Sequence, residues 1–168
     1  MPKIIKDLEN RLIEEAKNQI EESGYGAMTI RSVAKACGVG VGTVYNYFRS
    51  KDELLATYML NDWKECIRTI EEVSVHTDAP REVVLCMYDQ LTAFAKRHQS
   101  VFHDQSAATN FSRSFNRYHA LLRGQIALPL RKFCKDDFAA EFIAEALLSW
   151  TMAGRSFDDI YGMLEKLF

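Results

Sequence analysis

Residues 29–51, TIRSVAKACGVGVGTVYNYFRSK, constrain the fold of this chain more than any other segment. Thr29 is a favourable helix N-cap, and the apolar residues that follow it are spaced as on one face of a short helix. Gly38 ends that helix, because glycine adopts the left-handed conformation of a helix C-terminus at little steric cost. A second short helix is expected over residues 40–47. Two short helices joined by a glycine-marked turn predict a helix-turn-helix.

The outward positions of the second helix carry side chains of the kinds that contact DNA bases and phosphates. A recognition helix enters the major groove with its N-terminus first, so its first turn meets base edges and its flanks meet phosphates. Thr43 and Tyr45 are expected to carry DNA binding, with Tyr47 and Lys51 on the flanks. The full set of expected DNA-binding residues is Thr29, Arg31, Gly40, Val41, Thr43, Tyr45, Asn46, Tyr47 and Lys51.

The charge distribution supports this interpretation locally. Residues 23–51 contain no Asp or Glu and four basic residues, Arg31, Lys35, Arg49 and Lys51. The whole chain has 21 Lys and Arg against 23 Asp and Glu, a net charge of -2. A basic patch confined to one segment suits a protein that grips a few phosphates and reads bases at paired half-sites. It does not suit a protein that coats nucleic acid.

The same segment resembles the TetR-like transcriptional regulators. In that family the first helix is followed by a pattern like T-hydrophobic-x-x-hydrophobic-A-x-x-A-G-V-S-x-G-T-hydrophobic-Y-x-Y-F-x-S-K-x-x-L. The matching residues are Thr29, Ile30, Val33, Ala34, Gly38, Val39, Gly42, Thr43, Val44, Tyr45, Tyr47, Phe48, Ser50, Lys51 and Leu54. Gly40 departs from the Ser or Thr usual in the family, and Cys37 departs from the commoner Ala. Beyond residue 60 the resemblance rests on helical character alone.

Helical periodicity runs through the rest of the chain, and no segment alternates with the period of a strand. Helices are expected over residues 3–22, 50–75, 138–153 and 156–167, and Pro129 should kink or break a further one. The predicted fold is all-α, with an N-terminal three-helix head that carries the helix-turn-helix and a C-terminal helical bundle for ligand binding and dimerisation. The expected domains are residues 1–50 and residues 51–168.

The last two helices are rich in small residues, which permit close helix packing. On their own they predict an ordinary intramolecular core. The family resemblance implies instead a dimer held by a four-helix bundle of these helices, and one recognition helix reads too few base pairs to find an operator alone. The residues expected at the dimer interface are Phe142, Ala146, Leu147, Trp150, Ile160 and Leu164.

Aromatic and methionine side chains gather in the helices of the predicted bundle. Each one alone is more often a core residue than a ligand contact. As a group they have the character of an apolar small-molecule site with a few polar groups. The expected ligand-binding residues are Met59, Trp63, Cys66, Met87, Tyr88, Phe115, Tyr118 and His119. The helix over residues 50–75 would connect such a site to the head.

Other classes of function find little support in the sequence. The four cysteines form no CxxC pair, no metal motif or cofactor motif is present, and no apolar run approaches the ~18 residues of a membrane span. The N-terminus lacks a secretory signal, so a cytoplasmic protein is expected. No nucleophile elbow or phosphate loop indicates an enzyme.

Two functions remain open at this point. The first is a homodimeric repressor that a small apolar or aromatic effector releases from a palindromic DNA operator. The second is a TetR-like coactivator that a protein partner controls and that has no small-molecule pocket. An enclosed cavity in the bundle would distinguish them. The sequence does not decide between repression and activation.

Overall fold

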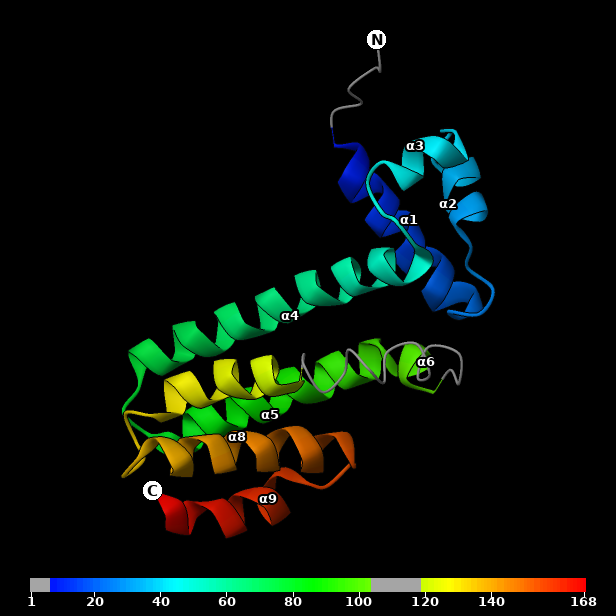
Figure 1. Cartoon of the computed structure of the whole chain (residues 1–168). Coiled ribbons are helices and arrows are strands. Elements are labelled where there is room, and N and C mark those ends of the chain that lie inside the picture. The colour runs from blue at the N-terminus through cyan, green and yellow to red at the C-terminus, as the bar shows by residue number, and fades with distance from the viewer. Residues whose placement is uncertain (1–6, 104–118) are drawn as a thin grey trace. The chain divides into compact units, whose positions relative to one another are not determined.

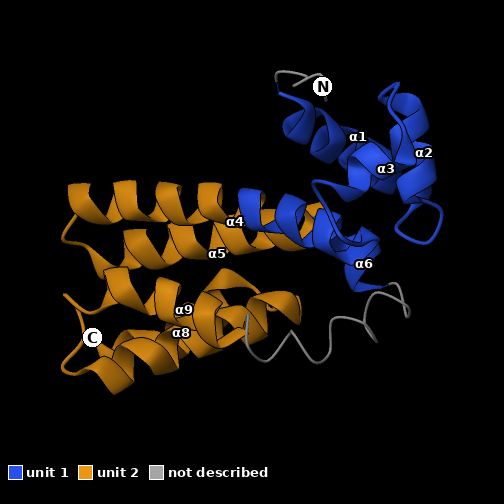
Figure 2. Cartoon of the chain, turned by 45° about the horizontal axis from the view of Figure 1, so that its top comes forward, with its two compact units in different colours: residues 1–61, 98–111 blue, residues 62–97, 112–168 orange. Residues whose placement is uncertain are grey.

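The computed structural model describes residues 7–103 and 119–168, and all regular structure within these ranges is helical (Figure 1). The all-α prediction is therefore confirmed for the described part of the chain. The residues form two compact units, named here the head and the body, which divide inside the long helix α4 (Figure 2). The head contains α1 (Leu8–Ser23), α2 (Ile30–Ala36), α3 (Val41–Tyr45), α4 (Lys51–His76) as far as Asn61, and α6 (Gln99–Phe102). The body contains α4 from Asp62 onward, α5 (Pro80–Arg97), a helix over residues 119–130, α8 (Asp137–Met152), α9 (Phe157–Leu164) and the 3-10 turn η1 (Glu165–Leu167).

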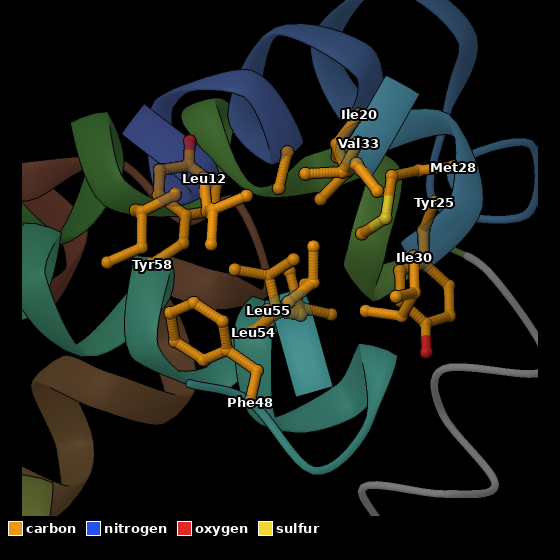
Figure 3. Close-up of a cluster of buried hydrophobic side chains, with 14 of the residues drawn as sticks. Leu12, Ile20, Tyr25, Met28, Ile30, Val33, Phe48, Leu54, Leu55 and Tyr58 are labelled. Carbon is orange, nitrogen blue, oxygen red and sulfur yellow. The ribbon is translucent and has the colours of Figure 1, made fainter. Parts of the chain in front are cut away.

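One apolar cluster forms the core of the head (Figure 3). Each helix of the head contributes one face to it, because apolar residues recur at helical spacing in α1, α2 and the first turns of α4. The buried members are Leu8, Leu12, Ile13, Ala16, Ile20, Tyr25, Met28, Ile30, Val33, Ala34, Val44, Phe48, Leu54, Leu55, Tyr58 and Val101. The first two turns of α4 thus complete the head, although the sequence prediction ended the DNA-binding domain at residue 50.

The bounds of α1 differ from the predicted helix over residues 3–22. The helix begins at Leu8, because Asp7 has a φ of 70°, a left-handed conformation that a helix interior does not accommodate. Residues 3–6 lie outside the described residues. The helix ends at Ser23, and Gly24 follows with a φ of 80°, as expected of a glycine stop.

In the body, α8 packs against α5 and α9, and α9 also packs against α5. The predicted helices over residues 138–153 and 156–167 are confirmed, except that the second continues past Leu164 as the 3-10 turn. The Asp136 carboxylate and the Ser156 hydroxyl cap α8 and α9, accepting hydrogen bonds from backbone amides at 2.8 Å and 3.2 Å. The helix over residues 119–130 ends one residue after Pro129, which confirms the predicted break.

A lysine secures the C-terminal end of α4. The Lys132 ammonium donates hydrogen bonds to the carbonyl oxygens of Ser74 and Thr77 at 2.6 Å and 2.7 Å. These carbonyls stand at the negative end of the helix dipole, where a cation is favourable. Lys132 therefore ends α4 and joins it to the turn after the helix over residues 119–130.

The stability of the body should fall at alkaline pH, because burial raises the pKa of the Cys66 thiol. Burial raises the pKa values of Cys86 and Cys134 as well. The unfolded chain then loses these protons at lower pH than the folded chain does. Their contribution to the free energy of unfolding is fully present below about pH 8.5 and is lost as the pH rises through the folded-state pKa values.

Guanidinium unfolding curves between about pH 7 and pH 9.5 measure this loss. Cys66→Ala should be less stable at neutral pH, since it removes a buried side chain, and should lose less stability on going to pH 9.5. An equal alkaline loss in the variant and the wild type would contradict a contribution from Cys66.

Candidate nucleic-acid interface

Helices α2 and α3 form the predicted helix-turn-helix. Thr29 caps α2, since its hydroxyl accepts a hydrogen bond from the Ser32 amide at 3.0 Å. Gly38 follows α2 with a φ of 69°, the left-handed conformation that the turn requires. The chain then reverses, and the Val39 amide donates to the Ala34 carbonyl at 2.9 Å. Val44 of α3 is buried in the head core, which directs the opposite side of α3 outward.

Helix α3 is shorter than the predicted helix over residues 40–47. It ends at Tyr45, so Asn46 and Tyr47 lie in the turn that follows it. The amides of Tyr47 and Phe48 both donate to the Val44 carbonyl at 3.0 Å, and Phe48 turns into the head core. Burial of Phe48 therefore pulls the chain out of the helix before Tyr47.

Helix α1 holds α2 at both of its ends. Near the N-terminus of α2, the Ser32 hydroxyl donates to the Gln19 side-chain oxygen at 2.5 Å. At the C-terminus, the Arg11 guanidinium donates to the Cys37 carbonyl at 3.1 Å, and the Cys37 thiol donates to the Arg11 carbonyl at 3.6 Å. Burial raises the pKa of this thiol, so it stays protonated at neutral pH. These contacts fix the position of α2 on the head.

The structure places the nine predicted DNA-binding residues in three settings. Thr29 serves as the cap of α2, Val41 packs against the head core, and Thr43 is half-buried. Lys51 is held at the start of α4, where its ammonium donates to the Tyr25 carbonyl oxygen. The exposed residues of the set are Arg31, Gly40, Tyr45, Asn46 and Tyr47. Tyr45 is the most open aromatic of the head, with 51% of its surface exposed.

Sequence reasoning missed the residues that support this surface. Tyr25 contacts both Lys51 and Asp52, and Arg11 and Gln19 hold α2. The signal for Tyr25 was its position between Gly24 and Gly26, which places a large aromatic in a tight turn. Arg11 and Gln19 look in the sequence like ordinary polar residues on the outer face of an amphipathic helix.

In the body, the predicted ligand-binding residue Trp63 makes the most specific contacts. Its indole N–H donates to the Gln125 side-chain oxygen at 2.7 Å, and its ring packs edge-on against Phe94 at 5.5 Å between centroids. The Cys66 thiol points to the Gln90 carbonyl at 3.9 Å, and Met87 is fully buried. Gln125 is a polar residue of this region that the sequence prediction did not include.

The other predicted ligand-binding residues have different surroundings. The Tyr88 hydroxyl donates to the Arg155 carbonyl at 3.0 Å, and its ring packs on Phe157. His119 lies 3.6 Å from a Glu145 carboxylate oxygen. Met59 packs against the core of the head. The predicted ligand contacts Phe115 and Tyr118 lie outside the described residues.

The predicted dimer-interface residues divide between two faces of the last helices. Leu147 is 0% exposed, and Ile160 and Leu164 are buried, so these three belong to the core of a single chain and leave no surface for a partner. Phe142 and Trp150 are about half exposed, and Ala146 between them is partly exposed. Phe138, which the prediction omitted, is 76% exposed on the same helix.

Two further observations concern the described residues only. In them no group of three or more His, Cys, Asp or Glu side chains is placed to hold a metal ion. No helix among them is long and apolar enough to cross a membrane.

An anchored helix pair with an exposed aromatic and basic face defines a helix-turn-helix DNA-binding protein. The family model described as "Bacterial regulatory proteins, tetR family" matches residues 12–58, which cover α1 to the second turn of α4. The chain is a TetR-family transcriptional regulator, a DNA-binding protein and not an enzyme.

Individual similar proteins agree with this assignment. The HTH-type transcriptional regulator SAB2452 of Staphylococcus aureus is 27% identical over 61% of this chain, and the fatty acid metabolism regulator protein of Bacillus subtilis is 27% identical over 52%. The chain spans 57% and 46% of the length of these relatives. The structure of the TetR family repressor AlkX from Dietzia has a TM-score of 0.67, with 15% identity and 93% of each chain covered. That likeness supports the fold.

Tyr45→Ala tests the outward face of α3. We expect the variant to bind its DNA operator more weakly by about 1–3 kcal/mol and to show an altered base preference, because a groove contact is removed. Fluorescence anisotropy with a duplex recovered by selection from a random pool measures the affinity. Lys64→Ala, an exposed lysine of the body, is the matched control and should bind like the wild type. Wild-type affinity in a folded Tyr45→Ala protein would contradict the interface.

Proposed function

We propose that the chain acts as a homodimeric repressor that binds a palindromic operator in the cytoplasm and leaves it when a small apolar or aromatic effector binds the body. The observation that supports the dimer best is the exposed apolar stripe of α8. Phe138, Phe142, Ala146 and Trp150 follow one another at intervals of four residues, and the three aromatic residues are each more than half exposed. A stripe of this kind on a helix surface is typical of a helix–helix interface.

The small residue in the stripe supports a close approach of a second helix. Ala146 lies between Phe142 and Trp150, where a partner side chain can pack between two aromatic residues. Two copies paired through α8 would present two heads to successive major grooves on one side of the duplex. Operator binding then needs both heads at the spacing of the half-sites.

Release by an effector requires a difference in affinity between two states of the dimer. A shift from 1:99 to 99:1 needs about 5.5 kcal/mol of differential binding free energy, more than a loose surface contact provides. An enclosed site around the buried Trp63 and Met87 would supply it through apolar burial, and the Gln125 amide would orient the ligand. The names of similar proteins refer to fatty-acid metabolism, fatty-acid degradation and n-alkane biodegradation. These names favour an effector with an alkyl chain.

Phe142→Glu tests the dimer. A carboxylate in an apolar interface costs several kcal/mol, so the variant should sediment as a monomer at micromolar concentration. The same variant should lose most of its affinity for the selected operator. Val75→Glu, which changes an exposed apolar residue of α4, is the matched control and should leave the wild-type dimer intact. A monomeric wild type, or selected DNA that shows a single half-site, would contradict the proposal.

Decanoate tests the effector class. We expect it to change the fluorescence of Trp63 and to release operator DNA from the wild type. Trp63→Phe should abolish the fluorescence change, whereas Trp150→Phe should retain it. Gln125→Leu should weaken decanoate binding and leave operator binding unchanged, because it removes only the polar group that faces Trp63. If neither decanoate nor an n-alkane of the same length changes the fluorescence or the DNA binding, a protein-controlled regulator becomes the better proposal.

A further inference from the structure

Tyr25 joins two opposite charges at the start of α4. Its side chain is only 3% exposed, and its hydroxyl donates a hydrogen bond to the Asp52 carboxylate. The Lys51 ammonium lies 3.9 Å from the centroid of the Tyr25 ring and donates a hydrogen bond to the Tyr25 carbonyl oxygen. A single residue of the turn after α1 therefore contacts both a cation and an anion of the head.

The core of the head holds the Tyr25 ring in place. Figure 3 shows the ring beside Ile30 at the edge of the apolar cluster. A buried aromatic ring packed against neighbours has little freedom to change rotamer. The positions of the two charged groups that it contacts are therefore set by core packing, and not only by the flexible side chains themselves.

The separation of these charges affects DNA binding because they act on a phosphate with opposite sign. A lysine at a phosphate adds affinity and salt dependence, whereas a carboxylate paired with that lysine cancels its charge. Neighbouring residues on a helix do not normally face each other. Lys51 and Asp52 nevertheless meet the same ring, one at its face and the other at its hydroxyl.

We infer that Tyr25 is a positioning residue for DNA binding. Its hydroxyl holds the Asp52 carboxylate away from the Lys51 ammonium, and its ring and carbonyl oxygen direct that ammonium toward a DNA phosphate. The inference rests on the proposed phosphate contact of Lys51 on the flank of α3. It adds a residue that touches no DNA and that controls how much of the Lys51 charge the phosphate meets.

Tyr25→Phe tests this role, since it removes the hydroxyl and retains the ring. The Asp52 carboxylate should then pair with Lys51. A labelled duplex of mixed sequence should bind several-fold more weakly than to the wild type. The slope of log K against log salt should fall by about 0.9, the value for one phosphate contact. Adding Asp52→Asn to Tyr25→Phe should restore both quantities, because the competing charge is gone.

The controls separate positioning from a loss of stability. Tyr58→Phe makes the same chemical change at another buried tyrosine of the head core, and should leave the salt slope unchanged. Lys51→Gln should lower the slope as Tyr25→Phe does, and Tyr25→Phe should lower it no further in that background. If Tyr25→Phe does not fold, Asp52→Glu carries the test, because it leaves the ring intact and moves the carboxylate past the hydroxyl. It should reproduce the weaker binding and the shallower slope.

Two results would overturn the inference. The first is wild-type affinity and slope in folded Tyr25→Phe, or in Asp52→Glu where that variant carries the test. The second is a double variant, Tyr25→Phe with Asp52→Asn, that binds as weakly as Tyr25→Phe alone. In both cases the wild type still binds the duplex, so they differ from a failure of DNA binding itself, in which the wild type would show no salt-dependent affinity.

Discussion

The packing of α2 and α3 on α1 is the interaction on which the rest of the head depends. Helices of seven and five residues are too short to be stable alone in water, so both require a partner surface. The apolar face of α1, with Leu12, Ala16 and Ile20, supplies that surface, and the first turns of α4 close it. Once Val44 is buried there, the outward direction of Tyr45 follows from helix geometry.

Basic side chains at helix C-termini recur in both units. Arg11 donates to the Cys37 carbonyl at the end of α2, and Lys132 donates to carbonyl oxygens at the end of α4. Both satisfy carbonyls that have no partner inside their helix and stand at the negative end of its dipole. Lys51 is bound to a carbonyl oxygen as well. The number of basic residues in the sequence therefore overstates the positive charge available to a nucleic acid.

Periodicity predicted the helices of the body well and the interface residues less well. Phe142 and Leu147 both fit an apolar helix pattern, yet one is half exposed and the other fully buried. A pattern of apolar residues records that a face is buried and not whether the same chain or a second chain covers it. The predicted ligand contacts show the same limit, since Tyr88 reaches the end of α8 while Trp63 meets Gln125.

The sequence by itself determined the helix-turn-helix, its glycine turn and the acid-free segment around it, because capping, glycine conformation and helical spacing are local properties. It also determined the all-α class. Only the tertiary structure decided that α4 shares the head core, that Arg11 and Gln19 hold α2, and that Tyr25 lies between Lys51 and Asp52. These contacts join residues from 13 to 27 positions apart, and no local propensity encodes which distant side chains meet when the apolar faces pack.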